Sequence, residues 1–187
     1  MNKIAVFWLR RDLRLTDNHG LFQALNSGLP VLPVFIFDPN ILGKLSDKND
    51  ARVSFIYHEV QKIKRETEKA GSSLKVFHAL PLEAFQQLIQ QYEIAAVFTN
   101  NDYEPYAIQR DSAVQTFLKS KGIEFHAFKD HIIFEGGEIR KDNGEPYTVF
   151  TPYSKKWKQV LGKNPMPEFS SEKYMNRLLK TNPFYFP

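Results

Sequence analysis

The chain has 187 residues, 42% of them hydrophobic and 25% charged, with a formal net charge of +4; this is an ordinary composition for one globular unit. It contains no cysteine, which excludes disulfide bonds, thiolate metal sites and cysteine nucleophiles and fits a cytoplasmic protein. No apolar run approaches the ~20 residues of a membrane-spanning helix, so we expect no membrane association.

Five short apolar runs are expected to form β-strands, because each is bounded by polar or turn-forming residues. They are residues 4–9, 31–37, 74–78, 94–98 and 123–127. Most have apolar side chains on both faces, which is typical of parallel strands covered on both sides. Pro33 lies inside the second run and indicates an edge strand or a bulge there.

Amphipathic segments alternate with these runs, at residues 17–28, 50–70, 82–92 and 105–121. Their apolar side chains recur every three or four residues, as in surface helices. Asp17 is expected to cap the first helix, and a glycine ends three of the four. Strand and helix in regular alternation predict an α/β fold: a doubly wound, five-stranded parallel sheet in a Rossmann-like, three-layer α/β/α arrangement.

The alternation ends near residue 128, and the last part of the chain is different. A helix is expected from Pro152 to Leu161, with Thr151 as its cap. We therefore predict a domain at residues 1–160 and a linker or docking arm at 161–187. Residues 151–187 carry seven basic and two acidic side chains, whereas residues 1–150 are nearly neutral. The basic stretch either faces DNA or is a solvated linker, and the prolines favour a linker.

Several common active-site motifs are absent from the sequence. The nine glycines form neither G-x-G-x-x-G nor a P-loop, the five histidines lack H-E-x-x-H spacing, and no G-x-S-x-G occurs. A self-contained hydrolase or a dinucleotide-dependent dehydrogenase is therefore not expected, and neither is a metal site or a catalytic residue.

Candidate binding residues follow the second and fourth predicted strands, and the carboxyl ends of parallel strands are where such sheets bind ligands. Six residues are candidates: Phe35, Phe37, Asp38, Arg52, Asp102 and Glu104. The two phenylalanines share one face of a strand, where they are either core residues or a wall for a flat ring. Asp102 is a candidate hydrogen-bond acceptor for a ligand, and Glu104 is either a second ligand-binding group or the cap of the next helix. The arginines after the first strand, Arg10 and Arg11, either form structural ion pairs or face a ligand.

Four segments, in this order, resemble the DNA photolyase and cryptochrome family. They are FWLRRDLRLTDN at 7–18, VFIFDP at 34–39, NDYEPYA at 101–107 followed by Arg110 and Asp111, and PYTVFTPY at 146–153 followed by Trp157. The first segment alone is distinctive, and the four occur in the correct order and spacing over residues 4–157.

The resemblance implies a light-driven flavoprotein with two domains. The N-terminal α/β domain of such proteins holds an antenna chromophore, and a helical C-terminal domain holds the catalytic FAD and the pocket for damaged DNA. The resemblance implies that this chain is the antenna domain, and we expect the FAD domain to lie outside it. The intact protein is accordingly expected to be a monomeric deoxyribodipyrimidine photo-lyase, a carbon–carbon lyase that repairs pyrimidine dimers. The alternatives are a cryptochrome-type photoreceptor domain and a generic nucleotide-binding α/β module.

The same resemblance indicates which antenna chromophore fits. Folate-type photolyases use an Asn-Glu pair where this chain has Tyr106 and Ala107, so folate is disfavoured. Arg52 and Asp102 match residues that contact the pigment in deazaflavin photolyases, so 8-hydroxydeazaflavin is favoured. Its flat tricycle would lie against Phe35 and Phe37, with Asp38 at its polar edge; FMN or FAD would suit the same slot.

Overall fold

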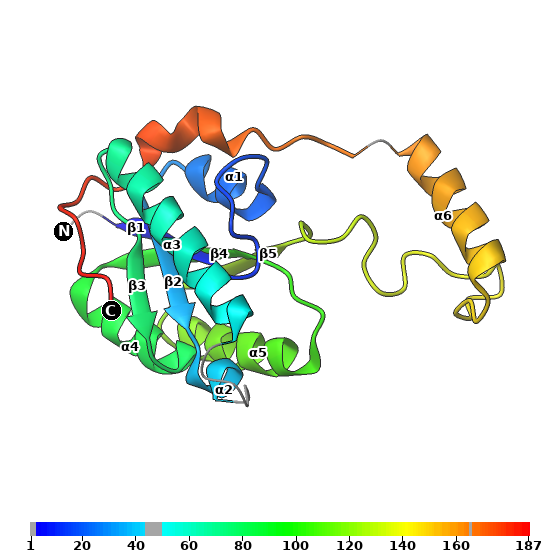
Figure 1. Ribbon diagram of the computed structural model, residues 1–187, viewed down its shortest axis with the longest axis horizontal. Coiled ribbons are helices and arrows are strands. Elements are labelled where there is room, and N and C mark those ends of the chain that lie inside the picture. Colours follow the sequence, from blue (N-terminus) through cyan, green and yellow to red (C-terminus); the bar gives the residue numbers. More distant parts are fainter. Residues whose placement is uncertain (1–2, 44–49, 165) are drawn as a thin grey trace.

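The computed structural model describes residues 3–43, 50–164 and 166–187, and it contains one parallel five-stranded sheet (Figure 1). The strands are β1 (Ile4–Leu9), β2 (Val31–Phe37), β3 (Lys75–His78), β4 (Ile94–Asn100) and β5 (Glu124–Phe128). Their order is β3-β2-β1-β4-β5, so β1 is central and the chain winds outward in both directions. The predicted doubly wound fold is confirmed.

Helices cover both faces of the sheet (Figure 1). One face packs against α1 (His19–Leu25) and α3 (Ala51–Lys69), and the other against α4 (Pro81–Gln91) and α5 (Pro105–Ser120). Alternation along β1 supplies both cores: Phe7 and Leu9 belong to the first, and Val6 and Trp8 to the second. This two-sided burial explains why β1 is apolar at every position.

Strand β2 is not an edge strand, because it lies between β1 and β3. Its pairing with β3 begins only at Val34, one residue after Pro33. Pro33 lies beside Phe7 of β1 and has no partner in β3. The proline is tolerated because the neighbouring strand does not extend that far.

The predicted caps of two helices are wrong. Asn18, not Asp17, caps α1, and its side chain accepts a hydrogen bond from the amide of Leu21 at 3.0 Å. Asp17 has a φ of 46°, and its carboxylate instead accepts a hydrogen bond from the amide of Phe169 at 2.8 Å. The helix α6 (Phe150–Lys163) begins before Thr151, with Val149 at its N-cap. Pro152 is accepted there because amides in the first turn of a helix have no intrahelical partner.

The last part of the chain leaves the domain and returns to it (Figure 1). Helix α6 projects away from the sheet and has no buried residue. After it, the 3-10 helix η1 (Ser171–Arg177) packs against α1, and the amide of Leu179 donates to the carbonyl of Val31 at 2.8 Å. Leu178 is buried in the core beneath α1 and α3. Within the described residues, no helix is both long and apolar enough to cross a membrane.

Replacing Leu178 should therefore destabilise the whole domain, although it lies near the end of the chain. Leu178→Ala is expected to lower the free energy of unfolding by about 3 kcal/mol, because it leaves a cavity in the core. Urea denaturation followed by circular dichroism measures this. Tyr185→Ala, at a residue that is 85% exposed, is the control and should change the free energy by less than about 0.5 kcal/mol. Equal values for the two variants would show that the returning segment does not contribute to the core.

Candidate functional site

A cavity of about 530 Å³ opens at the carboxyl ends of β1, β2 and β4. All six residues proposed from the sequence line it: Phe35, Phe37, Asp38, Arg52, Asp102 and Glu104. The topology brings them together, since the carboxyl ends of parallel strands lie at one edge of the sheet. The rings of Phe35 and Phe37 are 4.9 Å apart and meet at 75°, edge to face. The two rings form one apolar wall of the cavity, but they are not coplanar.

Asp38 is buried at the end of β2, and both of its carboxylate oxygens accept hydrogen bonds. One accepts from the amide of Asn40 at 2.9 Å, which caps the short helix α2 (Pro39–Leu42), and the other from the hydroxyl of Tyr106 at 2.6 Å. Burial, together with the bond to Asp38, raises the pKa of Tyr106, so the phenol stays protonated and donates. Asp38 therefore joins β2 to α5. Two features of the sequence are consistent with this pair: a carboxylate follows an apolar strand, and a phenol lies at the start of a helix.

Arg52 and Asp102 line the cavity from different elements and have different surroundings. Arg52 lies in the first turn of α3 with its side chain 75% exposed, and it pairs with Asp50 at 2.6 Å. Asp102 has a side chain that is only 5% exposed, and it accepts from the amide of Glu104 at 3.2 Å. Arg52 can thus turn toward a ligand at little cost, whereas Asp102 is held in place.

Glu104 occupies the N-cap position of α5, but its side chain makes no capping hydrogen bond. Instead it forms an ion pair with Arg11, with 2.7 Å between Nη1 and Oε1. The same nitrogen of Arg11 lies 3.5 Å from Asp102. Arg11 thereby connects the loop after β1 to the loop after β4 at the rim of the cavity, and the helix-cap role considered for Glu104 is wrong.

Two further arginines, Arg10 and Arg110, are more deeply buried in the cavity wall than Arg11 and Arg52. Arg10 and Arg110 both bind the carboxylate of Asp111, and Arg10 also donates to the carbonyl of Asn100. Each guanidinium carbon lies 5.0 Å from the ring centroid of Trp8. Arg10 therefore forms a structural ion pair and also lines the cavity. Neither Trp8 nor Arg110 is among the residues proposed from the sequence, because Trp8 lies within a strand and Arg110 within a helix, away from the loops that follow the second and fourth strands.

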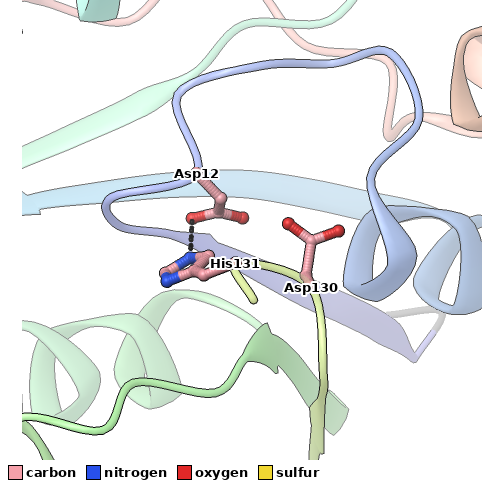
Figure 2. A group of neighbouring side chains, drawn as sticks. All are labelled: Asp12, Asp130 and His131. Atoms are coloured by element: carbon pink, nitrogen blue, oxygen red, sulfur yellow. Dashed lines mark ion pairs between the residues drawn. The ribbon is translucent and has the colours of Figure 1, made fainter. Parts of the chain in front are cut away.

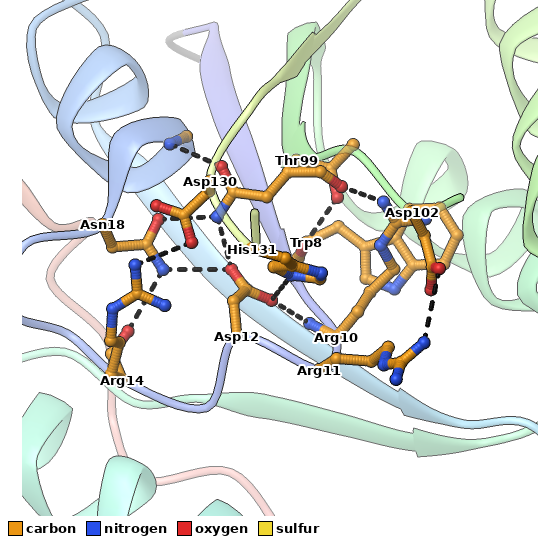
Figure 3. Close-up of polar contacts among 12 residues, drawn as sticks. Trp8, Arg10, Arg11, Asp12, Arg14, Asn18, Thr99, Asp102, Asp130 and His131 are labelled. Atoms are coloured by element: carbon orange, nitrogen blue, oxygen red, sulfur yellow. Dashed lines mark hydrogen bonds and ion pairs between the residues drawn. The ribbon is translucent and has the colours of Figure 1, made fainter. Parts of the chain in front are cut away.

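The loop that carries Arg10 and Arg11 is fixed by the buried carboxylate of Asp12 (Figure 3). Asp12 accepts hydrogen bonds from the side-chain amides of Asn18 and Asn100 at 3.0 and 2.6 Å and from the amide of Arg10 at 2.8 Å. Burial raises the pKa of this carboxyl, but His131, whose Nε2 lies 3.9 Å away, and hydrogen bonds from Asn18 and Arg10 outweigh burial and lower the pKa to about 2. Asp12 therefore remains ionised at neutral pH.

Asp12, Asp130 and His131 come close enough together to suggest a metal site (Figure 2). Asp130 is already bonded, however: Arg14 donates to one oxygen at 2.7 Å, and the amide of His19 donates to the other at 3.0 Å. A cation would have to displace several of these donors and of those on Asp12. The cluster is better described as a hydrogen-bonded network that joins the loops after β1 and β5.

Comparisons with known proteins bear on the family and the fold of this chain. The sequence model described as DNA photolyase matches residues 5–171. The deoxyribodipyrimidine photo-lyase of Synechococcus sp. is 36% identical over 152 residues, which cover 81% of this chain and 31% of that protein. Arabidopsis thaliana cryptochrome-2 is 29% identical over 162 residues, which cover 86% and 26%. The crystal structure of an archaeal photolyase from Sulfolobus tokodaii superimposes with a TM-score of 0.62 at 33% identity, over 71% of this chain and 32% of that one.

The chain belongs to the DNA photolyase family. It spans about a third of the length of the Synechococcus photolyase and of the Sulfolobus tokodaii structure.

The Asp12 network predicts a specific loss of stability in acid. An aspartate whose pKa is about 2 in the folded chain and 3.8 in the unfolded chain stabilises the fold above pH 3.8. About 2.5 kcal/mol is then lost as the pH falls from about 5 to below 2. In Asp12→Asn this loss should disappear, so unfolding free energies measured in urea between pH 7 and 2.5 should fall less steeply than in the unaltered chain. Asp142→Asn, at a side chain that is 95% exposed, is the control, and an acid slope unchanged in Asp12→Asn would contradict the assignment.

Proposed function

We propose that this chain is the light-harvesting, chromophore-binding domain of a DNA photolyase. The observation that carries the proposal is the single cavity lined by all six candidate residues at the carboxyl edge of the sheet. Its volume of about 530 Å³, its apolar wall and its few fixed polar groups are what a cofactor pocket requires.

The residues of the cavity suit a planar pigment of the deazaflavin type. Phe35 and Phe37 offer an apolar surface to a ring system, Asp102 offers a fixed acceptor for a ring N–H, and Arg52 an adjustable donor for a ring carbonyl. We favour 8-hydroxydeazaflavin, with FMN as the nearest substitute. FAD is a further candidate, because the Sulfolobus tokodaii photolyase is described with two FAD molecules and an implied novel light-harvesting cofactor. Folate is disfavoured, since Tyr106 already binds Asp38 and Ala107 is buried without a polar side chain.

A bound pigment would absorb near-UV or blue light and pass the excitation to FAD elsewhere in the protein. The residues of this chain have the task of holding it in one place and one orientation. The Asp38–Tyr106 bond and the Arg11 ion pairs fix opposite sides of the cavity, and the Asp12 network fixes the loop between them. The site is thus preorganised, which suits a site whose task is to hold a pigment in one place and one orientation.

The partners of the domain follow from the same proposal. Relatives about three times as long leave room for a C-terminal FAD domain in the same protein. Helix α6 and the residue before it expose Phe150 and Val149, which would contact that domain. For the domain bounds we propose an α/β domain at residues 1–160 and an interdomain linker or arm at 161–187, the last part of which packs back on the domain through Leu178. For the intact protein we propose a cytoplasmic monomer that repairs pyrimidine dimers in damaged DNA.

A cryptochrome-type photoreceptor is the second candidate, and the similarity to Arabidopsis thaliana cryptochrome-2 supports it. Its identity of 29% is below the 36% of the Synechococcus photolyase, over similar shares of this chain. The repair of a thymine dimer in light by the full-length protein would separate the two candidates, because a photoreceptor leaves the dimer intact.

Pigment binding tests the site directly. Fluorescence titration of the chain should show binding of 8-hydroxy-5-deazariboflavin and FMN and weaker binding of a reduced folate. Asp102→Ala and Arg52→Ala should each weaken deazaflavin binding by roughly ten- to a hundredfold, the value of a hydrogen bond to a charged group, with little change in urea stability.

Arg65→Ala is the matched control for Arg52→Ala, because Arg65 lies exposed on the same helix and does not line the cavity. It should bind the pigment like the unaltered chain. Wild-type affinity in both site variants would show that the cavity is not the pigment site. Tight binding of ATP with no binding of any pigment would favour the generic nucleotide-binding module instead.

A further inference from the structure

Trp8 is the indole in the wall of the proposed pigment cavity (Figure 3). The chain has two tryptophans, and the other, Trp157, lies on α6 beside Phe134, with 5.6 Å between the ring centroids. Trp8 is 1% exposed and extends from β1 into the core beneath α4 and α5. A pigment in this cavity would therefore lie next to an aromatic side chain that is easily oxidised.

The indole of Trp8 could quench the excited pigment of a light-harvesting site by electron transfer. An excited flavin-type ring is a strong one-electron oxidant, and among the aromatic side chains indole loses an electron most easily when no proton leaves with it. One electron would pass from the indole to the excited pigment, leaving a tryptophan radical cation and a pigment reduced by one electron. The excitation would be lost before it could be transferred.

The charges around Trp8 oppose that electron transfer. The guanidinium carbons of Arg10 and Arg110 each lie 5.0 Å from the ring centroid, and both side chains are more than nine-tenths buried. The two cations share the carboxylate of Asp111, so this group carries one net positive charge. Asp12, the next carboxylate in the network, hydrogen-bonds to the backbone amide of Arg10 and to Asn18 and Asn100 rather than to either guanidinium, and its charge acts on Arg10 more weakly than that of Asp111.

We propose that Arg10 and Arg110 keep the indole of Trp8 from being oxidised by the excited pigment, so that excitation leaves the cavity by energy transfer. A cation over an aromatic face is attracted to the neutral ring but repelled by its radical cation. Because the three side chains are buried, water screens this repulsion only weakly. The inference rests on the proposed function, and it assigns positioning residues that shape the electrostatics of the same cavity.

A purely structural role is the competing explanation, in which the arginines only join β1 to α5 through Asp111. Stability would respond to mutation under both explanations, so the test needs a different observable. The excited-state lifetime of the bound pigment is suitable, because it reports electron transfer from Trp8 and not the stability of the fold.

Time-resolved fluorescence of 8-hydroxy-5-deazariboflavin, with enough protein to bind all of it, provides the test. The lifetimes in the unaltered chain, in Trp8→Phe and in the control Trp157→Phe should be the same, because Trp8 does not quench. Arg110→Gln removes one cation and leaves the Arg10–Asp111 pair, so the lifetime should shorten by roughly tenfold. The double variant Arg110→Gln with Trp8→Phe should recover the long lifetime, and Arg110→Lys should stay close to the unaltered chain.

Two results would overturn the inference while pigment binding stands. One is a longer lifetime in Trp8→Phe than in the unaltered chain, which needs no arginine variant and so holds even if Arg110→Gln does not fold. The other is a pigment-bound Arg110→Gln with an unchanged lifetime, or a short one that Trp8→Phe does not reverse. Absence of pigment binding in the unaltered chain would instead overturn the proposed function, and this inference with it.

Discussion

The rest of this structure depends on the buried carboxylate of Asp12. An ionised group inside a protein costs several kcal/mol unless hydrogen bonds replace its water. Here donors from the loop after β1, from Asn18 at the start of α1 and from Asn100 at the end of β4 supply them. One charge thus holds three elements at the carboxyl edge of the sheet, where the cavity opens.

Much of the cavity wall is attached to this network. Arg10 and Arg11 leave the same loop in different directions, one to the buried ion cluster at Trp8 and the other to the acidic pair at the rim. Asp38 and Tyr106 close the opposite side. A site whose polar groups are already paired is suited to holding a ligand still. Arg52 differs in being exposed, since its only partner among the described residues is the neighbouring Asp50 at the start of the same helix.

The arm around α6 differs from the domain in how it is stabilised. Its helix has apolar side chains but buries none of them, whereas the segment after it returns to the core through Leu178 and to β2 through Leu179. An amphipathic helix without a core of its own is typical of a segment that packs against something else. In the function proposed above, a C-terminal FAD domain would supply that surface.

The sequence by itself determined the strands, the long helices and the edge of the sheet at which the six candidate residues meet. Hydrophobic periodicity is local and repeats over many residues, so one misplaced side chain does not obscure it. Only the tertiary structure decided which partner each polar group takes. Asp17 binds Phe169 rather than capping α1, Glu104 binds Arg11 rather than capping α5, and Asp38 binds Tyr106. Those partners lie 68 to 152 residues apart in the sequence. The same side chains can also hydrogen-bond to nearby backbone groups as helix caps, and only the folded chain brings the distant partner within reach.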